Sequence, residues 1–131
     1  MFKILFTANS FKLYFFVCLV AIEFLATTIT VHISLVESMW DKSNHFIAFF
    51  VLYIFMSLGY YKLSLQVKVA ILLAFGLQIE IVQDLTGRSL FSGLDILADS
   101  IGVLIGILTI LYLKKFTKVF SLVRCDNSLD N

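Results

Sequence analysis

The chain has 131 residues, of which 60% are hydrophobic and 15% are charged, with a formal net charge of +1 and no proline. Soluble globular domains do not reach this hydrophobic fraction, so the composition indicates an integral membrane protein. Nucleic-acid-binding proteins gather basic residues in a patch that this sequence lacks, and we therefore expect no nucleic-acid partner.

Four apolar stretches predict four transmembrane helices. They share a length close to the roughly 20 residues that cross a bilayer, and they cover about residues 11–33, 44–61, 65–83 and 93–113. A polar link at 37–44 separates the first two, whereas the second and third are joined by a short turn. Because no linker or repeat divides the chain, we predict one all-α domain, 1–131, in which a four-helix bundle is followed by a polar tail at 114–131.

Lysine and arginine are distributed unevenly between the two ends of these helices. Most flank one side, namely Lys3, Lys12, Lys62, Lys68, Lys114, Lys115, Lys118 and Arg124. The opposite side carries only Lys42 and Arg88. The positive-inside rule therefore predicts cytoplasmic N and C termini, with the loops after the first and third helices outside.

Ionisable and polar residues occur at the helix ends that this topology places at the outer face. Three pairs are spaced by three or four residues and so share a helical face: Asp41 with His45, Glu80 with Gln83, and Asp95 with Asp99. Gly76, Gly102 and Gly106 continue the faces of the acids at helical spacing. Glycines at this spacing allow close helix packing in membranes, so we expect the carboxylates to point into the bundle.

Glu23 lies deeper in its predicted helix than the other acids. An ionised side chain at that depth costs about 2.5 kcal/mol or more. Thr27 and Thr30 lie on the same stripe and could satisfy the carboxyl group by hydrogen bonding. We favour a structural role for Glu23 and keep a functional acid as the alternative.

Two segments, WDKSNHFIAFFVL at 40–52 and EIVQDLTGRSLFSGLDILADSIGVLIG at 80–106, resemble the VanZ-like family of small bacterial membrane proteins. The resemblance covers most of the second to fourth helices, and it is carried by Asp41, Lys42, His45, Glu80, Gln83, Arg88, Asp95, Asp99, Gly102 and Gly106. The chain departs from the family in two places. The family usually has a proline shortly before the arginine, whereas this chain has Leu85, Thr86 and Gly87, so Gly87 could make the turn. Asp99 occupies a position where asparagine is more common.

The resemblance implies a multi-pass protein of the bacterial cytoplasmic membrane with its site at the outer face. The family is named for a protein linked to resistance to the glycopeptide teicoplanin. VanZ-like proteins have also been placed beside enzymes that exchange or cleave lipid headgroups, which suggests a phospholipid or polyprenyl-phosphate headgroup as the partner. Fold-level likeness alone does not assign that function.

The polar residues suit such chemistry. Arg88 and Gln83 are the candidate phosphate-binding residues, because a guanidinium binds phosphate oxygens through two hydrogen bonds. The candidate catalytic residues are His45 for proton transfer, Asp41 to orient it, and Glu80 as a second acid or base. Asp95 and Asp99, with Glu80 as a further candidate, could hold a divalent cation such as Mg²⁺ or Mn²⁺.

Structural explanations exist for each of these residues. His45 could hydrogen-bond a loop, Asp95 could favour a helix N-terminus, and Arg88 could pair with a neighbouring acid. Three functions therefore stay open: headgroup-modifying enzyme, non-catalytic lipid- or envelope-binding protein that alters antibiotic access, and, more weakly, an ion carrier. The exposed first helix could equally pack on a second copy of the chain.

Overall fold

The computed structural model describes residues 7–28, 35–87 and 90–116, and within these ranges every regular element is an α-helix. The helices are α2 (Ala8–Thr28), α3 (Leu35–Gly59), α4 (Leu65–Leu85) and α5 (Gly93–Phe116). All four are long and apolar enough to cross a membrane. The predicted all-α class and the four transmembrane helices are therefore confirmed.

The observed helix ends differ from the predicted ones for local reasons. α2 begins at Ala8, three residues early, because the hydroxyl oxygen of Thr7 accepts the N–H of Ser10 at 3.1 Å and caps the helix. α3 begins at Leu35, so the polar link predicted at 37–44 is helical. Residues 35–44 contain no glycine or proline, and the helix therefore continues beyond its apolar span. The predicted end of the first helix, at 29–33, lies outside the described residues.

α4 ends in the turn that the sequence predicts. The N–H of Thr86 donates to the carbonyl of Val82 at 3.0 Å, and the N–H of Gly87 donates to that of Asp84 at 3.1 Å. Gly87 has a φ of +68°, in the left-handed region that favours glycine. Gly87 thus makes the turn that ends α4.

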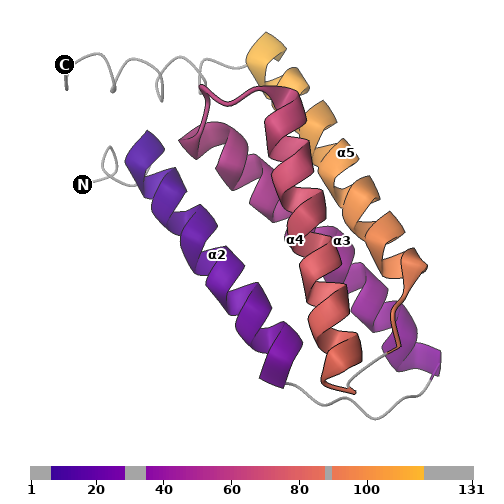
Figure 1. The fold of residues 1–131 in the computed structure, drawn as a ribbon. Helices are drawn as coiled ribbons and strands as arrows, with labels where there is room; N and C mark the ends of the chain where they lie inside the picture. Colours follow the sequence, from indigo (N-terminus) through magenta and orange to yellow (C-terminus); the bar gives the residue numbers. More distant parts are fainter. Residues whose placement is uncertain (1–6, 29–34, 88–89, 117–131) are drawn as a thin grey trace.

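The helices run up and down, so each end of the bundle collects parts that are distant in sequence (Figure 1). One end holds the start of α2, the end of α3, the start of α4 and the end of α5. The other end holds the end of α4 and the start of α5 beside the first turns of α3. α3 packs most extensively against α5 and next against α2. Side chains on α3 are therefore placed between those of the other helices.

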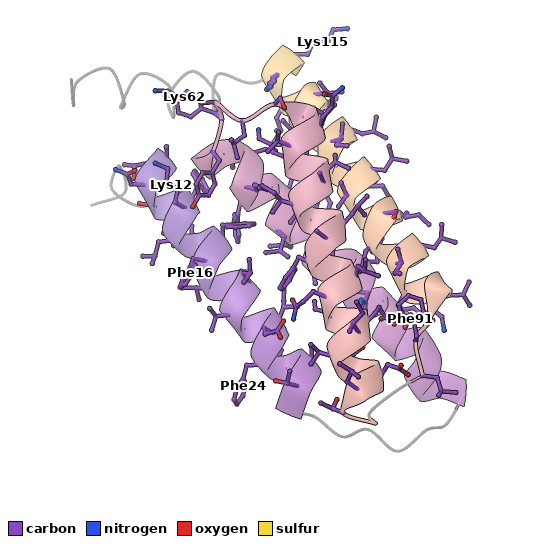
Figure 2. All side chains as sticks on the ribbon, in the orientation of Figure 1. Lys12, Phe16, Phe24, Lys62, Phe91 and Lys115 are labelled. Carbon is purple, nitrogen blue, oxygen red and sulfur yellow. The ribbon has the colours of Figure 1, made fainter. Side chains whose placement is uncertain are left out.

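The buried core follows one face of α3. Phe49, Leu52, Tyr53 and Met56 recur at helical spacing and are almost completely buried. In contrast, the outward faces of the bundle carry exposed apolar side chains, such as Phe16 in Figure 2. Such an exposed apolar surface is what lipid chains would cover in a bilayer.

Glycines on α5 let α3 and α5 approach closely. A Cβ atom at Gly102 would collide with the carbonyl oxygen of Phe46, and one at Gly106 would lie 2.9 Å from the Tyr53 ring. The backbone contact at Gly102 leaves a larger residue no room unless the helices separate. Close packing of α3 and α5 at these two positions is what glycines at helical spacing predict.

Glu23 hydrogen-bonds across the bundle rather than along its own helix. The side-chain amide of Gln78 on α4 donates to Glu23 Oε1 at 2.9 Å. The Thr27 hydroxyl, which we expected to satisfy the carboxyl group, instead donates to the main-chain carbonyls of Glu23 and Phe24. A Thr hydroxyl on a helix readily reaches the carbonyl four residues earlier, which explains the difference. Thr30 lies outside the described residues.

Candidate functional site: a buried histidine and carboxylate cluster

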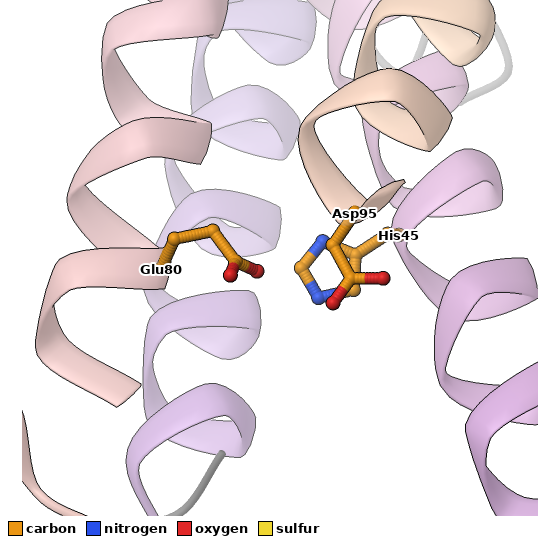
Figure 3. A group of neighbouring side chains, drawn as sticks. All are labelled: His45, Glu80 and Asp95. Atoms are coloured by element: carbon orange, nitrogen blue, oxygen red, sulfur yellow. The ribbon is translucent and has the colours of Figure 1, made fainter. Parts of the chain in front are cut away.

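Three ionisable side chains from three helices point toward one another inside the bundle (Figure 3). His45 comes from α3, Glu80 from α4 and Asp95 from α5. One potential ligand atom from each lies within 4.8 Å of the other two. His45 is 9% exposed, Glu80 0% and Asp95 6%, so the cluster is enclosed by protein.

Helical spacing brings these residues to the same place. His45 lies one turn before Phe49, on the face of α3 that forms the core. Glu80 belongs to the buried face of α4, which also includes Gly76 and Gln83. Asp95 lies in the first turn of α5. The cluster forms because α4 ends and α5 begins beside the same part of α3.

Asp99 positions His45. Asp99 Oδ1 lies 3.0 Å from His45 Nδ1, although the two residues are 54 positions apart in sequence. Asp99 is completely buried, and its second oxygen, Oδ2, would lie only 2.5 Å from a Cβ atom added to Gly76. Gly76 thus provides the space for this carboxylate. A hydrogen bond from Nδ1–H to Asp99 leaves the lone pair of the ring on Nε2, the usual arrangement for a metal-binding histidine.

Glu80 links the cluster to the start of α5. Its Oε2 accepts the N–H of Ser92, the residue before α5, at 2.9 Å. The carbonyl of Ser92 in turn accepts the N–H of Asp95 at 3.1 Å. Ser92 therefore acts through its main chain, and Glu80 supplies the side-chain oxygen that fixes the helix start.

The remaining oxygens of the cluster are its main electrostatic feature. Glu80 Oε1, Asp95 Oδ1 and Asp99 Oδ2 are buried and have no hydrogen-bond partner among the described residues. Three carboxyl groups around one imidazole would carry up to three negative charges if ionised. Burying such charges without partners is expensive, so the site requires protons or a bound cation. An imidazole with carboxylates is a ligand set typical of divalent first-row metals.

The structure brings together four of the predicted site residues: His45, Glu80, Asp95 and Asp99. It favours His45, Glu80 and Asp95 as ligands, whereas the sequence suggested Asp95 and Asp99, with Glu80 as a further candidate. Gln83 is buried on α4, one turn beyond Glu80, and its predicted phosphate role stays a prediction. Arg88 and the side chain of Asp41 lie outside the described residues, so their predicted roles stay predictions.

Sequence reasoning missed two features of the molecule. The first is the hydrogen bond from the Ser92 main chain to Glu80, because a main-chain donor leaves no signal in the residue types. The second is Lys68, which we counted among the flanking lysines although it is 7% exposed inside α4. A lysine four residues into an apolar helix is the signal that could have identified it.

No family model, curated protein or solved structure matches this chain. The likeness to VanZ-like proteins therefore rests on the residues quoted from the sequence. The site must be interpreted from its own geometry.

Proposed function

We propose that this chain is a multi-pass membrane protein that holds a divalent cation at His45, Glu80 and Asp95 and uses it to bind the phosphate of a lipid headgroup. One observation carries the proposal: ligand atoms from three helices lie within 4.8 Å of one another in a buried cluster whose carboxylate oxygens include several without a hydrogen-bond partner among the described residues. A cation would neutralise these oxygens. Its remaining positive charge would attract phosphate oxygens, which bridge readily to divalent metals.

The ligand set refines the expected metal. Mg²⁺ prefers oxygen ligands and keeps several waters, whereas an imidazole with two carboxylates suits Mn²⁺, Fe²⁺ or Zn²⁺. We therefore propose a transition metal in preference to Mg²⁺. Asp99 is a positioning residue in this scheme, since it contacts His45 rather than the cation.

The lysine distribution supports an outer location for this site. Lys12, Lys62 and Lys115 lie at the end of the bundle away from the cluster (Figure 2). By the positive-inside rule that end is cytoplasmic, and the cluster then lies toward the outer leaflet. Arg88 follows α4 by three residues and is the proposed second phosphate ligand.

The resemblance to VanZ-like proteins adds support for a bacterial cytoplasmic membrane and for a role in the cell envelope, with teicoplanin resistance as the phenotype to examine.

Two activities follow from a bound headgroup. The first is headgroup transfer or phosphoester hydrolysis assisted by the metal, which lowers the pKa of bound water or polarises the phosphoryl group. The second is binding without turnover. We favour binding without turnover, because three of the four side chains in the cluster would bind the metal and Asp99 would hold His45. None of these four side chains would then be free to transfer a proton.

The test uses detergent-purified full-length protein loaded with Mn²⁺ or Zn²⁺. Glu80→Gln and His45→Ala should lose the metal, measured by inductively coupled plasma mass spectrometry, whereas wild type retains about one ion per chain. Asp84→Asn is the matched control, an exposed acid on the same helix that should retain the metal. Equal metal content in wild type and Glu80→Gln would contradict the cation centre.

Lipid is measured separately in the same preparations. Mass spectrometry of copurified lipids should show a phosphate-containing lipid in wild type that is depleted in Glu80→Gln. Product formation in vesicles distinguishes turnover from binding alone. Metal bound without any change in retained lipid would refute the headgroup part of the proposal.

A further inference from the structure

A second polar site lies at the opposite end of the bundle from the histidine cluster. A cavity of about 130 Å³ is enclosed by α3, α4 and α5. Its polar lining consists of Tyr53, Ser57, Tyr61, Lys68 and Lys114, and leucine and isoleucine side chains form the rest. This cavity shares no residue with the His45 cluster.

Lys68 is the unusual member of the lining. It is 7% exposed, and among the described residues its ammonium group makes no ion pair and no side-chain hydrogen bond. Lys114 brings a second amino group to the same cavity, and no described carboxylate lines it. Lys114 is exposed, whereas Lys68 is buried next to apolar walls without an ion pair among the described residues, so Lys68 is the group that calls for an anion.

Ser57 provides a separate indication of a ligand. Its side chain is 1% exposed, and its hydroxyl oxygen has no hydrogen-bond partner among the described residues. A buried hydroxyl without a partner is unfavourable, and this one lines the same cavity as Lys68. The cavity thus combines the ammonium group of a largely buried lysine with a buried hydroxyl group that can donate a hydrogen bond.

The size and position of the cavity restrict the anion. Pockets for drug-sized ligands measure about 300–1,000 Å³, so a cavity of about 130 Å³ suits one compact group. It lies beside the turn between α3 and α4, at the end that carries Lys12, Lys62 and Lys115 (Figure 2). In a bilayer this end meets the headgroups, where lipid phosphates are abundant.

We propose that this cavity binds a phosphate group, with Lys68 as its main charge partner and with Lys114 and Ser57 as further donors. The phosphate can come from an anionic lipid headgroup or from free phosphate in solution. Either source supplies oxygens that accept from ammonium and hydroxyl donors. The inference does not depend on the metal centre, because the two sites use different residues at different ends.

The test compares Lys68→Met with Lys62→Met in the full-length protein. Methionine keeps most of the length of lysine and removes its charge, and Lys62 is an exposed lysine at the same end. Binding is titrated with short-chain phosphatidylglycerol, with phosphatidylcholine of the same chain length, and with inorganic phosphate. Wild type should bind one of the two anionic probes more tightly than phosphatidylcholine. Lys68→Met should weaken that binding by about tenfold or more, whereas Lys62→Met should change it by less than about twofold.

The probes also distinguish the source of the anion. Preference for phosphatidylglycerol over inorganic phosphate assigns the site to a lipid, and the reverse assigns it to free phosphate. Equal binding by wild type and Lys68→Met, or an equal loss in Lys62→Met, would overturn the proposal. Ser57→Ala tests the same cavity without removing a charge, which matters if Lys68→Met folds poorly. Unchanged phosphate binding in both Ser57→Ala and Lys68→Met would refute the proposal.

Discussion

The Asp99–His45 contact offers a sensitive test of how the cluster works. Asp99→Ala removes the carboxylate that lies 3.0 Å from His45 Nδ1, and Asp99→Asn keeps an oxygen acceptor of nearly the same shape. The imidazole in the alanine variant can rotate and can place its proton on either nitrogen. The asparagine variant retains the acceptor and also corresponds to the residue more common in VanZ-like proteins.

The expected magnitude follows from the role of Asp99 behind a ligand. Loss of an outer partner of a metal-binding histidine typically reduces metal affinity by about 10–100-fold. We expect Asp99→Ala to fall in this range, which corresponds to about 1.4–2.8 kcal/mol of binding free energy. Asp99→Asn should lose less than about tenfold, since its amide oxygen still accepts from Nδ1–H but carries no charge.

The assay is a competition titration of Mn²⁺ or Zn²⁺ against a chelating dye, with thermal unfolding in detergent recorded for each variant. Unfolding shows whether a loss of affinity comes from local positioning or from loss of the fold. Equal metal affinity in wild type and Asp99→Ala would refute the positioning role. A larger loss in Asp99→Asn than in Asp99→Ala would also contradict it, because the isosteric side chain would then disturb the site more than its removal.

Three further variants test the packing, the polar contact within the membrane and the orientation. Gly102→Ala should destabilise the α3–α5 contact by about 1–3 kcal/mol through overpacking, seen as a lower unfolding temperature, whereas Gly93→Ala, with no atom within 4 Å of its added Cβ, should not. Glu23→Ala should remove the hydrogen bond between α2 and α4 and lower stability by about 0.6–1.7 kcal/mol; unchanged stability would argue that lipid or water replaces this bond. In a cysteine-free background, Leu85→Cys should react with an impermeant reagent in intact cells and Lys62→Cys should not, and the opposite pattern would reverse the predicted topology.

Hydropathy was sufficient to predict the four helices, because a membrane span needs a long apolar stretch whatever its tertiary contacts. It failed at the start of α3, where polar residues at 37–44 remain helical. A helix can continue past the apolar span when no glycine or proline interrupts it, and hydropathy alone does not detect this. The turn at Gly87 was predictable because left-handed backbone favours glycine.

Helical spacing placed the acids on inward faces, and the positive-inside rule brought their helix ends together. That reasoning identified His45, Glu80, Asp95 and Asp99 as neighbours. It could not pair His45 with Asp99, because two helices can meet in several rotations that all keep polar faces inward. The space beside Gly76 decides the pairing, and that space exists only in the packed bundle.

At Lys68 the sequence shows an unusual residue but does not reveal whether that residue is buried. The sequence contains the unusual feature, a lysine inside an apolar helix, but a lysine near a helix end can extend its ammonium group to the interface. Burial of Lys68 beside Ser57 depends on how α3, α4 and α5 meet at that end. Residue types therefore suggest such a cavity only after the packing is known.

X-ray absorption spectroscopy of the Mn²⁺- or Zn²⁺-loaded full-length protein tests the cation centre most directly. The spectrum should show one imidazole and at least two carboxylate oxygens around the metal, and the imidazole scattering should disappear in His45→Ala. A wild-type spectrum without imidazole scattering, or one that His45→Ala leaves unchanged, would contradict a metal centre built from α3, α4 and α5.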